Sequence, residues 1–114
     1  MVELVIKNET SFDLYLLLEA YEEVKFITLP REIAEELIKF AKENNVPIKY
    51  HTTFLLPETI LLFLVSDYTA VIAIKRSSKP EAKQVKSFLQ KFVEYAKENN
   101  IDVYPLDKYV YNYL

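Results

Sequence analysis

The sequence predicts an α/β (α+β) domain in which helices flank a mixed central sheet. Two long segments, about 30–45 and 80–100, repeat apolar residues at intervals of three and four, the period of an amphipathic helix. Two short apolar runs, 59–66 and 70–75, are rich in branched side chains and bounded by turn residues, as strands are. With 114 residues, of which 51% are hydrophobic, the chain can bury one core but not two.

Both predicted helices carry one apolar stripe and have recognisable ends. The stripe of the first helix consists of Ile33, Ala34, Leu37, Ile38, Phe40 and Ala41. The stripe of the second consists of Val85, Phe88, Leu89, Phe92 and Ala96. Pro80 suits a first helical turn, and the pairs Asn44-Asn45 and Asn99-Asn100 can take the left-handed conformation that ends a helix where glycine is absent.

The remaining strands are predicted from their places beside the helices. Residues 46–54 and 101–106 each follow a helix, and residues 109–114 are expected to pair with 101–106 across Asp107-Lys108. The run 59–66 is continuously apolar, which is typical of a central strand. The resulting order predicts a helix on either face of the sheet. It is the α-β-β-β-α-β order of restriction-endonuclease-like folds.

The first 29 residues are predicted to be an extension, of strand or helix, on a core formed by residues 30–114. Within the extension, residues 11–21 have two interpretations. Ser11 as a helix N-cap favours a helix. The echo of FAKENNV (40–46) in YAKENNI (95–101), with weaker echoes upstream, indicates a duplicated unit in which this stretch is a strand. A common helix ending and chance explain the same echo without duplication.

Composition excludes several classes of function. Without cysteine the chain has no thiol catalyst or thiolate metal site, and one histidine excludes a multi-histidine site. Without glycine it has no P-loop, dinucleotide fingerprint or nucleophile elbow. No apolar run reaches the roughly 18 residues that span a bilayer, and the first residues do not form a signal peptide. We expect a cytoplasmic protein without cofactor, metal or membrane partner, whose composition suits a thermophile, for example an archaeon.

Positive charge is concentrated in one segment. The net charge is −3, but the segment from Lys75 to Lys91 contains six basic residues and one acid, Glu81. This segment therefore carries +5 and the rest of the chain −8. A solvated helix face explains the segment, and so does a patch that contacts phosphate groups on an otherwise acidic body. In the second interpretation the nucleic-acid-binding residues are Lys75, Arg76, Lys79, Lys83 and Lys86.

A metal-dependent nuclease of the PD-(D/E)xK type is one hypothesis for such a patch. These enzymes use two carboxylates and a lysine to hold Mg²⁺ and a water against the scissile phosphate. Pro57-Glu58 followed by Lys75 has the required spacing, but Ala73 stands where the second acid belongs, so Glu81 would have to replace it. A turn and a surface lysine account for the same residues without catalysis.

A second hypothesis comes from the C-terminal part of the chain. The run VIAI (71–74), Pro80, the long amphipathic helix, Lys97-Glu98, IDVYPL (101–106) and VYNYL (110–114) follow one another there. This succession resembles the C-terminal domain of archaeal tRNA-splicing endonuclease subunits. The resemblance implies a metal-free site in which a tyrosine is the base, a histidine the acid and a lysine stabilises phosphate charge.

The catalytic positions that this resemblance implies are incompletely filled. Lys97 falls where the family lysine belongs. The histidine position holds Ile72, the only histidine is His51 on an earlier predicted strand, and Tyr68 lies in a turn. The resemblance therefore implies a noncatalytic structural subunit, with Lys97 as a remnant, that supports a catalytic endonuclease subunit and the binding of precursor tRNA.

The same resemblance implies a partner interface at the C-terminal end. In that family the closing strands pair across subunits, and an acidic loop docks onto the opposite dimer. The corresponding residues here are Tyr104, Asp107, Tyr109, Tyr111 and Tyr113. Tyrosine is enriched at interfaces because it combines a large contact area with a polar tip. The alternatives are a strand with one tyrosine face in the core and a small homodimeric assembly protein of unknown role.

Overall fold

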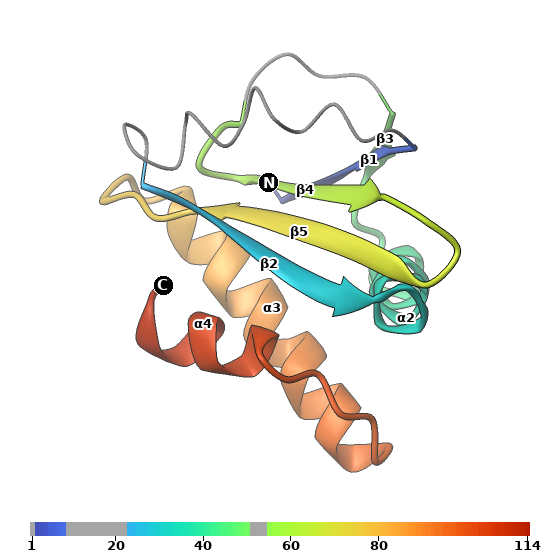
Figure 1. Ribbon diagram of the computed structural model, residues 1–114. Helices are drawn as coiled ribbons and strands as arrows, with labels where there is room; N and C mark the ends of the chain where they lie inside the picture. The colour runs from blue at the N-terminus through green and yellow to red at the C-terminus, as the bar shows by residue number, and fades with distance from the viewer. Residues whose placement is uncertain (1, 9–22, 51–54) are drawn as a thin grey trace.

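The computed structural model describes residues 2–8, 23–50 and 55–114, which form a five-stranded mixed sheet covered by three helices (Figure 1). The strands are β1 (Glu3–Lys7), β2 (Val24–Pro30), β3 (Ile48–Lys49), β4 (Thr59–Leu64) and β5 (Thr69–Lys75). The helices are α2 (Arg31–Glu43), α3 (Ala82–Glu98) and α4 (Leu106–Asn112). The predicted α/β class is confirmed. Within these ranges no helix has the length and apolarity needed to cross a membrane.

The strands stand in the order β2-β5-β4-β1-β3. Strand β1 is parallel to both of its neighbours, β4 and β3, whereas β4, β5 and β2 form an antiparallel series. Strand β4 therefore lies in the middle, with five of its six residues buried, which confirms the central strand predicted from the continuously apolar run. The extension predicted over residues 1–29 contributes β1 and β2 to the same sheet.

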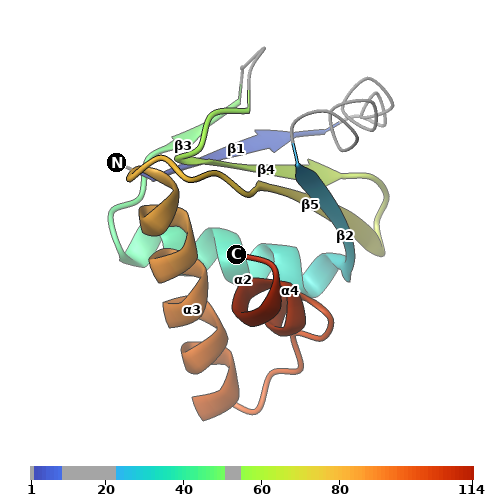
Figure 2. The same cartoon turned by 90° about the vertical axis from the view of Figure 1, so that its left-hand side faces the viewer.

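All three helices pack on one face of the sheet (Figure 2). Leu62 and Ile72 point to this face and join the cluster formed by the helix stripes. Leu61 and Phe63 point to the opposite face and belong to a separate, smaller cluster. The prediction of a helix on either face is therefore wrong for the described helices. The physical reason is that the two long helices share one aromatic cluster, in which Phe40 of α2 lies within 5.6 Å of the rings of Phe88 and Phe92 on α3.

The two long helices are otherwise as predicted. The predicted stripe of α3 is buried throughout, and in that of α2 only Ile38 is half-buried. Asn45 and Asn100, which follow the last turns, both have a φ of 57°. Asparagine therefore supplies the left-handed residue that glycine supplies at many helix ends.

The C-terminal strands are the main error of the sequence prediction. Residues 101–106 do not form a strand, and most of 109–114 belongs to α4. Leu106 and Val110 are fully buried and lie one helical turn apart, so a helix brings both into the core. The α-β-β-β-α order is present, but a helix follows it where a strand was expected. Within the described part of the predicted strand 46–54, Ile48–Lys49 pairs with β1. Residues 51–54 lie outside the described residues, and so do residues 11–21, for which a helix and a strand were both considered.

Candidate functional site

The predicted nucleic-acid-binding residues divide into two groups in the structure. Lys79, Lys83 and Lys86 occupy the loop before α3 and its first two turns, and Lys91 follows on the same helix. We call these four residues the lysine ridge. The side chains of Lys79, Lys83 and Lys91 are exposed, that of Lys86 is half-buried, and none of the four takes part in an ion pair within the described ranges. Their charges are therefore free to attract an anion.

Arg76 does not belong to this ridge. Its Nε lies 2.9 Å from Oε2 of Glu23, the residue before β2, and its guanidinium lies 4.9 Å from the ring of Tyr113. The hydrogen bond from Arg76, together with its charge, lowers the pKa of the Glu23 carboxyl, and the same contact raises the pKa of Arg76. Arg76 thus joins the sheet to the end of the chain. Lys75, at the end of β5, is half-buried and also has a partner.

The predicted tyrosine interface does not form one face of a strand. Tyr104 and Tyr111 are exposed, whereas Tyr109 and Tyr113 are half-buried and pack against the core with their rings 6.5 Å apart. Asp107 lies in the first turn of α4, where its Oδ1 accepts a hydrogen bond from its neighbour's backbone N–H. The predicted closing strand is therefore wrong, because these residues belong to or flank a helix, and the contact of this surface with a partner stays a prediction.

The described residues do not assemble the tyrosine, histidine and lysine set that the resemblance implies. Lys97 is exposed near the end of α3, with its Nζ 5.7 Å from the centre of the Tyr111 ring. Ile72 is fully buried in β5, and Tyr68 is exposed in the turn between β4 and β5. His51 lies outside the described residues.

The residues of the metal-nuclease hypothesis come from three segments, of which the antiparallel pairing of β4 and β5 brings Glu58 and Lys75 to the same end of the sheet. Glu58 precedes β4, Lys75 ends β5, and Glu81 is exposed before α3. Across the part of the chain that the structure describes, no group of three or more His, Cys, Asp and Glu side chains could hold a metal ion. The hypothesis uses two carboxylates and a lysine, so it stays a prediction.

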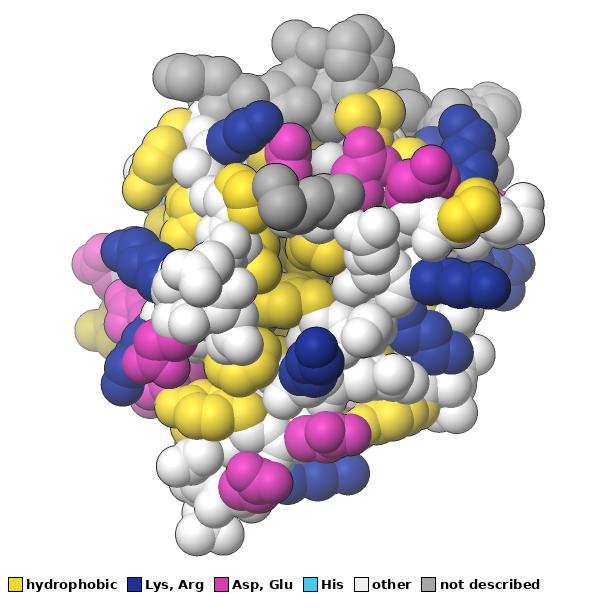
Figure 3. Space-filling view, turned by 180° about the vertical axis from the view of Figure 1, so that it is seen from behind, with side chains coloured by type: hydrophobic (Ala, Val, Ile, Leu, Met, Phe, Trp, Pro, Cys, Tyr) yellow, Lys and Arg dark blue, Asp and Glu magenta, His cyan; other side chains and the backbone are white. Residues whose placement is uncertain are grey.

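A groove beside the lysine ridge was not foreseen from the sequence. It has a volume of about 460 Å³ and lies between α3 and the end of α2. Its lining consists of Val2, Asn44, Asn45, Val46, Lys83, Gln84, Ser87, Phe88 and Lys91. From behind, the molecule shows a hollow with hydrophobic side chains at its centre and a group of Lys and Arg side chains to one side (Figure 3). The spacing of the α3 residues, which recur on one helical face, was the only signal for it in the sequence.

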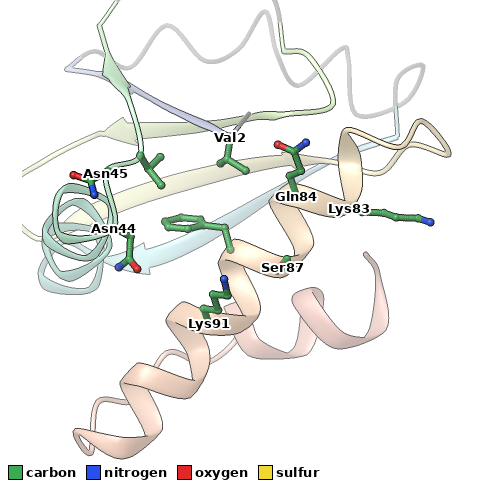
Figure 4. Close-up of a pocket in the computed structure, with 9 residues that line it drawn as sticks. Val2, Asn44, Asn45, Lys83, Gln84, Ser87 and Lys91 are labelled. Atoms are coloured by element: carbon green, nitrogen blue, oxygen red, sulfur yellow. The ribbon is translucent and has the colours of Figure 1, made fainter.

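The groove and the ridge are continuous. Lys83 lines the groove and also a smaller pocket of about 60 Å³ that it shares with Arg76, Ser77 and Lys86. Asn44 and Asn45 lie across from Gln84, Ser87 and Lys91, while Lys83 points away from α2 (Figure 4). The site therefore combines an apolar floor with the amides of Asn44 and Asn45 on one wall, and the amide of Gln84 with the ammonium group of Lys91 on the other (Figure 4).

Comparisons of this chain with protein-family models, with curated proteins and with solved structures found no match.

Proposed function

We propose that this chain is a nucleic-acid-binding protein that contacts phosphate groups through the lysine ridge. The single observation that supports the proposal is the set of four lysines, free of ion pairs among the described residues, on one helix and its leading loop. Clustered lysine charge on one helix is the electrostatic pattern of phosphate-backbone binding. The body of the protein is acidic, so binding is expected to be confined to this surface.

The size of the ridge suits a few phosphates. Lys83 and Lys91 are eight residues apart on α3, which corresponds to about 12 Å along the helix axis. One strand of a duplex carries a phosphate every ~3.4 Å of axis, so the ridge spans about four phosphates. We therefore expect modest affinity with a salt dependence, expressed as log Kd against log salt concentration, of magnitude about 3 to 4.

The narrower role of a splicing-endonuclease structural subunit stays a prediction. Precursor tRNA is one member of the ligand class proposed here. The segment expected as the closing strand is helical in this chain, so a closing strand does not support that role. A cytoplasmic location, expected from the composition, belongs to the present proposal.

The test is fluorescence anisotropy with a labelled 20-base-pair duplex at two or more salt concentrations. Reversing two ridge charges with Lys83→Glu/Lys86→Glu should weaken binding at least about tenfold at low salt and reduce the salt slope by about 2. The matched control is Lys39→Glu/Lys42→Glu, which makes the same charge change at the same spacing on α2.

The control separates a local site from the effect of net charge. We expect the α2 variant to bind within about threefold of the unmodified protein, because its lysines lie outside the ridge. Equal weakening by both variants, or no binding by the unmodified protein, would contradict the proposal.

A further inference from the structure

The groove beside the lysine ridge has the chemistry of a site for a planar, uncharged group that is attached to an anion. Val2 and Phe88 are each only 7% exposed and, with half-buried Val46, provide the apolar surface. The volume of about 460 Å³ lies within the roughly 300–1,000 Å³ that is typical of sites for small ligands. The groove can therefore hold one flat ring system.

The polar groups around this surface are of two kinds. Asn44 donates from its Nδ2 to the carbonyl oxygen of Phe40 at 2.8 Å, which leaves its side-chain oxygen as an acceptor. The side-chain amides of Asn45 and Gln84 make no hydrogen bond to the described residues. Carboxamides can both donate to and accept from the edge of a nucleobase. Lys91 adds an ammonium group to the same lining.

We propose that this groove receives one unpaired base of a single-stranded nucleic acid, while the flanking phosphates lie on Lys83 and Lys91. The inference rests on the proposed function and extends it by naming the form of nucleic acid that the site prefers. Lys83 connects the two parts, because it lines the groove and belongs to the ridge. A backbone bound along the ridge therefore passes the mouth of the groove.

The arrangement of charge favours a nucleotide over an acidic peptide. Both lysines of the groove are on its α3 wall, and the residues from the α2 end and β1 end are neutral. A nucleotide has this asymmetry, since its base is uncharged and its phosphate is anionic. In a duplex the faces of the bases are covered by stacking, so only an unpaired base can enter.

The experiment compares a labelled single-stranded 20-mer with the duplex of the same sequence in anisotropy titrations at equal salt. We expect the protein to bind the single strand at least about fivefold more tightly, because only an unpaired base can bury a face against the apolar surface of the groove. Ser87→Leu fills the groove without changing charge, because Ser87 is exposed and lines it. This variant should lose the preference for single strands and retain duplex affinity within about twofold.

The matched control is Ser78→Leu, the same change at an exposed position that does not line the groove. It should retain the preference. Equal binding of single strand and duplex by the unmodified protein, or an unchanged preference in Ser87→Leu, would overturn the inference while leaving the lysine ridge intact. If the unmodified protein bound neither the single strand nor the duplex, the proposed function would be overturned as well. Competition by polyglutamate as effective as by the single strand would show that only negative charge is recognised, and would also overturn the inference.

A second measurement does not depend on the folding of a variant. Amide chemical shifts of the ¹⁵N-labelled protein are followed while an unlabelled tetranucleotide is added. We expect the largest changes at Val46, Ser87 and Phe88, which come from both walls of the groove. Changes confined to Lys79 and Lys83 would mean that only phosphate is bound, and the groove would then have no role.

Discussion

Helices α2 and α3 end in the same four residues, Lys-Glu-Asn-Asn, and with the same geometry. In each, the first asparagine donates from its Nδ2 at 2.8 Å to the carbonyl oxygen four residues earlier. The second asparagine has a φ of 57° in both. The N–H of the following residue, Val46 or Ile101, then bonds to the carbonyl oxygen five residues back, which is the Schellman pattern. The two helix endings are thus equivalent.

The chain continues differently after the two endings. After the first, the carbonyl oxygen of Pro47 accepts the N–H of Leu4 at 2.9 Å, and the next two residues pair with β1 as strand β3. After the second, Oδ1 of Asp102 accepts the N–H of Tyr104 at 3.0 Å, and the chain turns into α4. The helix ending is therefore a local property of the sequence, whereas the continuation depends on which part of the core remains uncovered.

The largest expected effect on stability comes from disrupting α4, the helix that follows the end of α3. Val110 of α4 is fully buried and Tyr111 is 44% exposed, so adjacent residues have opposite roles. Val110→Asp places an unpaired carboxylate in the core and should lower the free energy of unfolding by about 3–5 kcal/mol. Tyr111→Asp should change it by less than about 1 kcal/mol, because it loses only a contact with Lys97 at the surface.

Urea unfolding of both variants measures this difference. It also distinguishes the helix from the strand that the alternating tyrosines predicted. In that strand Tyr111 would share one face with Tyr109 and Tyr113, and Val110 would point the other way. A Tyr111→Asp variant as destabilised as Val110→Asp would contradict the helix.

The two continuations also show what the sequence can predict about the fold. The stripes of α2 and α3 were recognisable because each repeats over three or more turns. Helix α4 has only seven residues and two buried positions, so the alternation of tyrosines at 109, 111 and 113 outweighed its period. Strand β3 has two paired residues and depends on β1, more than 40 positions earlier, which no local pattern records.

The same contrast holds for the candidate site. The lysine ridge was predictable because its charges lie close together in the sequence. The ion pair of Arg76 was not predictable in this way, since its partner Glu23 is 53 residues away. The groove was missed because its walls, at Asn44-Asn45 and at Gln84–Lys91, come together only when α2 and α3 pack on the same face of the sheet.

A smaller effect tests whether the two helix endings are energetically equivalent. Asn45→Ala and Asn100→Ala each place a Cβ-bearing residue without a local hydrogen-bonding group at a φ of 57°, which should cost about 1 kcal/mol. Asn45→Gly and Asn100→Gly should stay within about 0.5 kcal/mol of the unmodified protein, because glycine accepts this conformation. Thermal and urea unfolding of the four variants would show equal losses at the two positions. A loss at one position only would mean that the structure after the helix, and not the helix ending itself, determines the free energy of unfolding.

The smallest expected effect concerns two exposed ion pairs, one beside β3 and one beside the end of α4. Lys49 and Glu3 join β3 to β1 at 2.8 Å, whereas Arg76 and Glu23 lie beside Tyr113 just after α4. The Tyr113 hydroxyl donates to the backbone carbonyl of Glu23, so this second pair is also tied to the end of the chain.

The pair of Glu23 and Arg76 should make stability depend on acid pH. The pKa of Glu23 is lowered in the folded protein by the hydrogen bond and charge of Arg76, so the folded state binds its proton less readily than the unfolded state does. The stabilisation is therefore present above the ordinary glutamate pKa of about 4.3 and is lost as the pH falls through the lowered folded value. Because both side chains are exposed, the effect should be small and should weaken in 1 M salt.

Urea unfolding between about pH 6 and pH 3 should show that the stability advantage of the unmodified protein over Glu23→Gln shrinks as the pH falls. In an Arg76→Gln background the same substitution should give a difference that no longer depends on pH in this way, and a persistent dependence there would assign it to another partner.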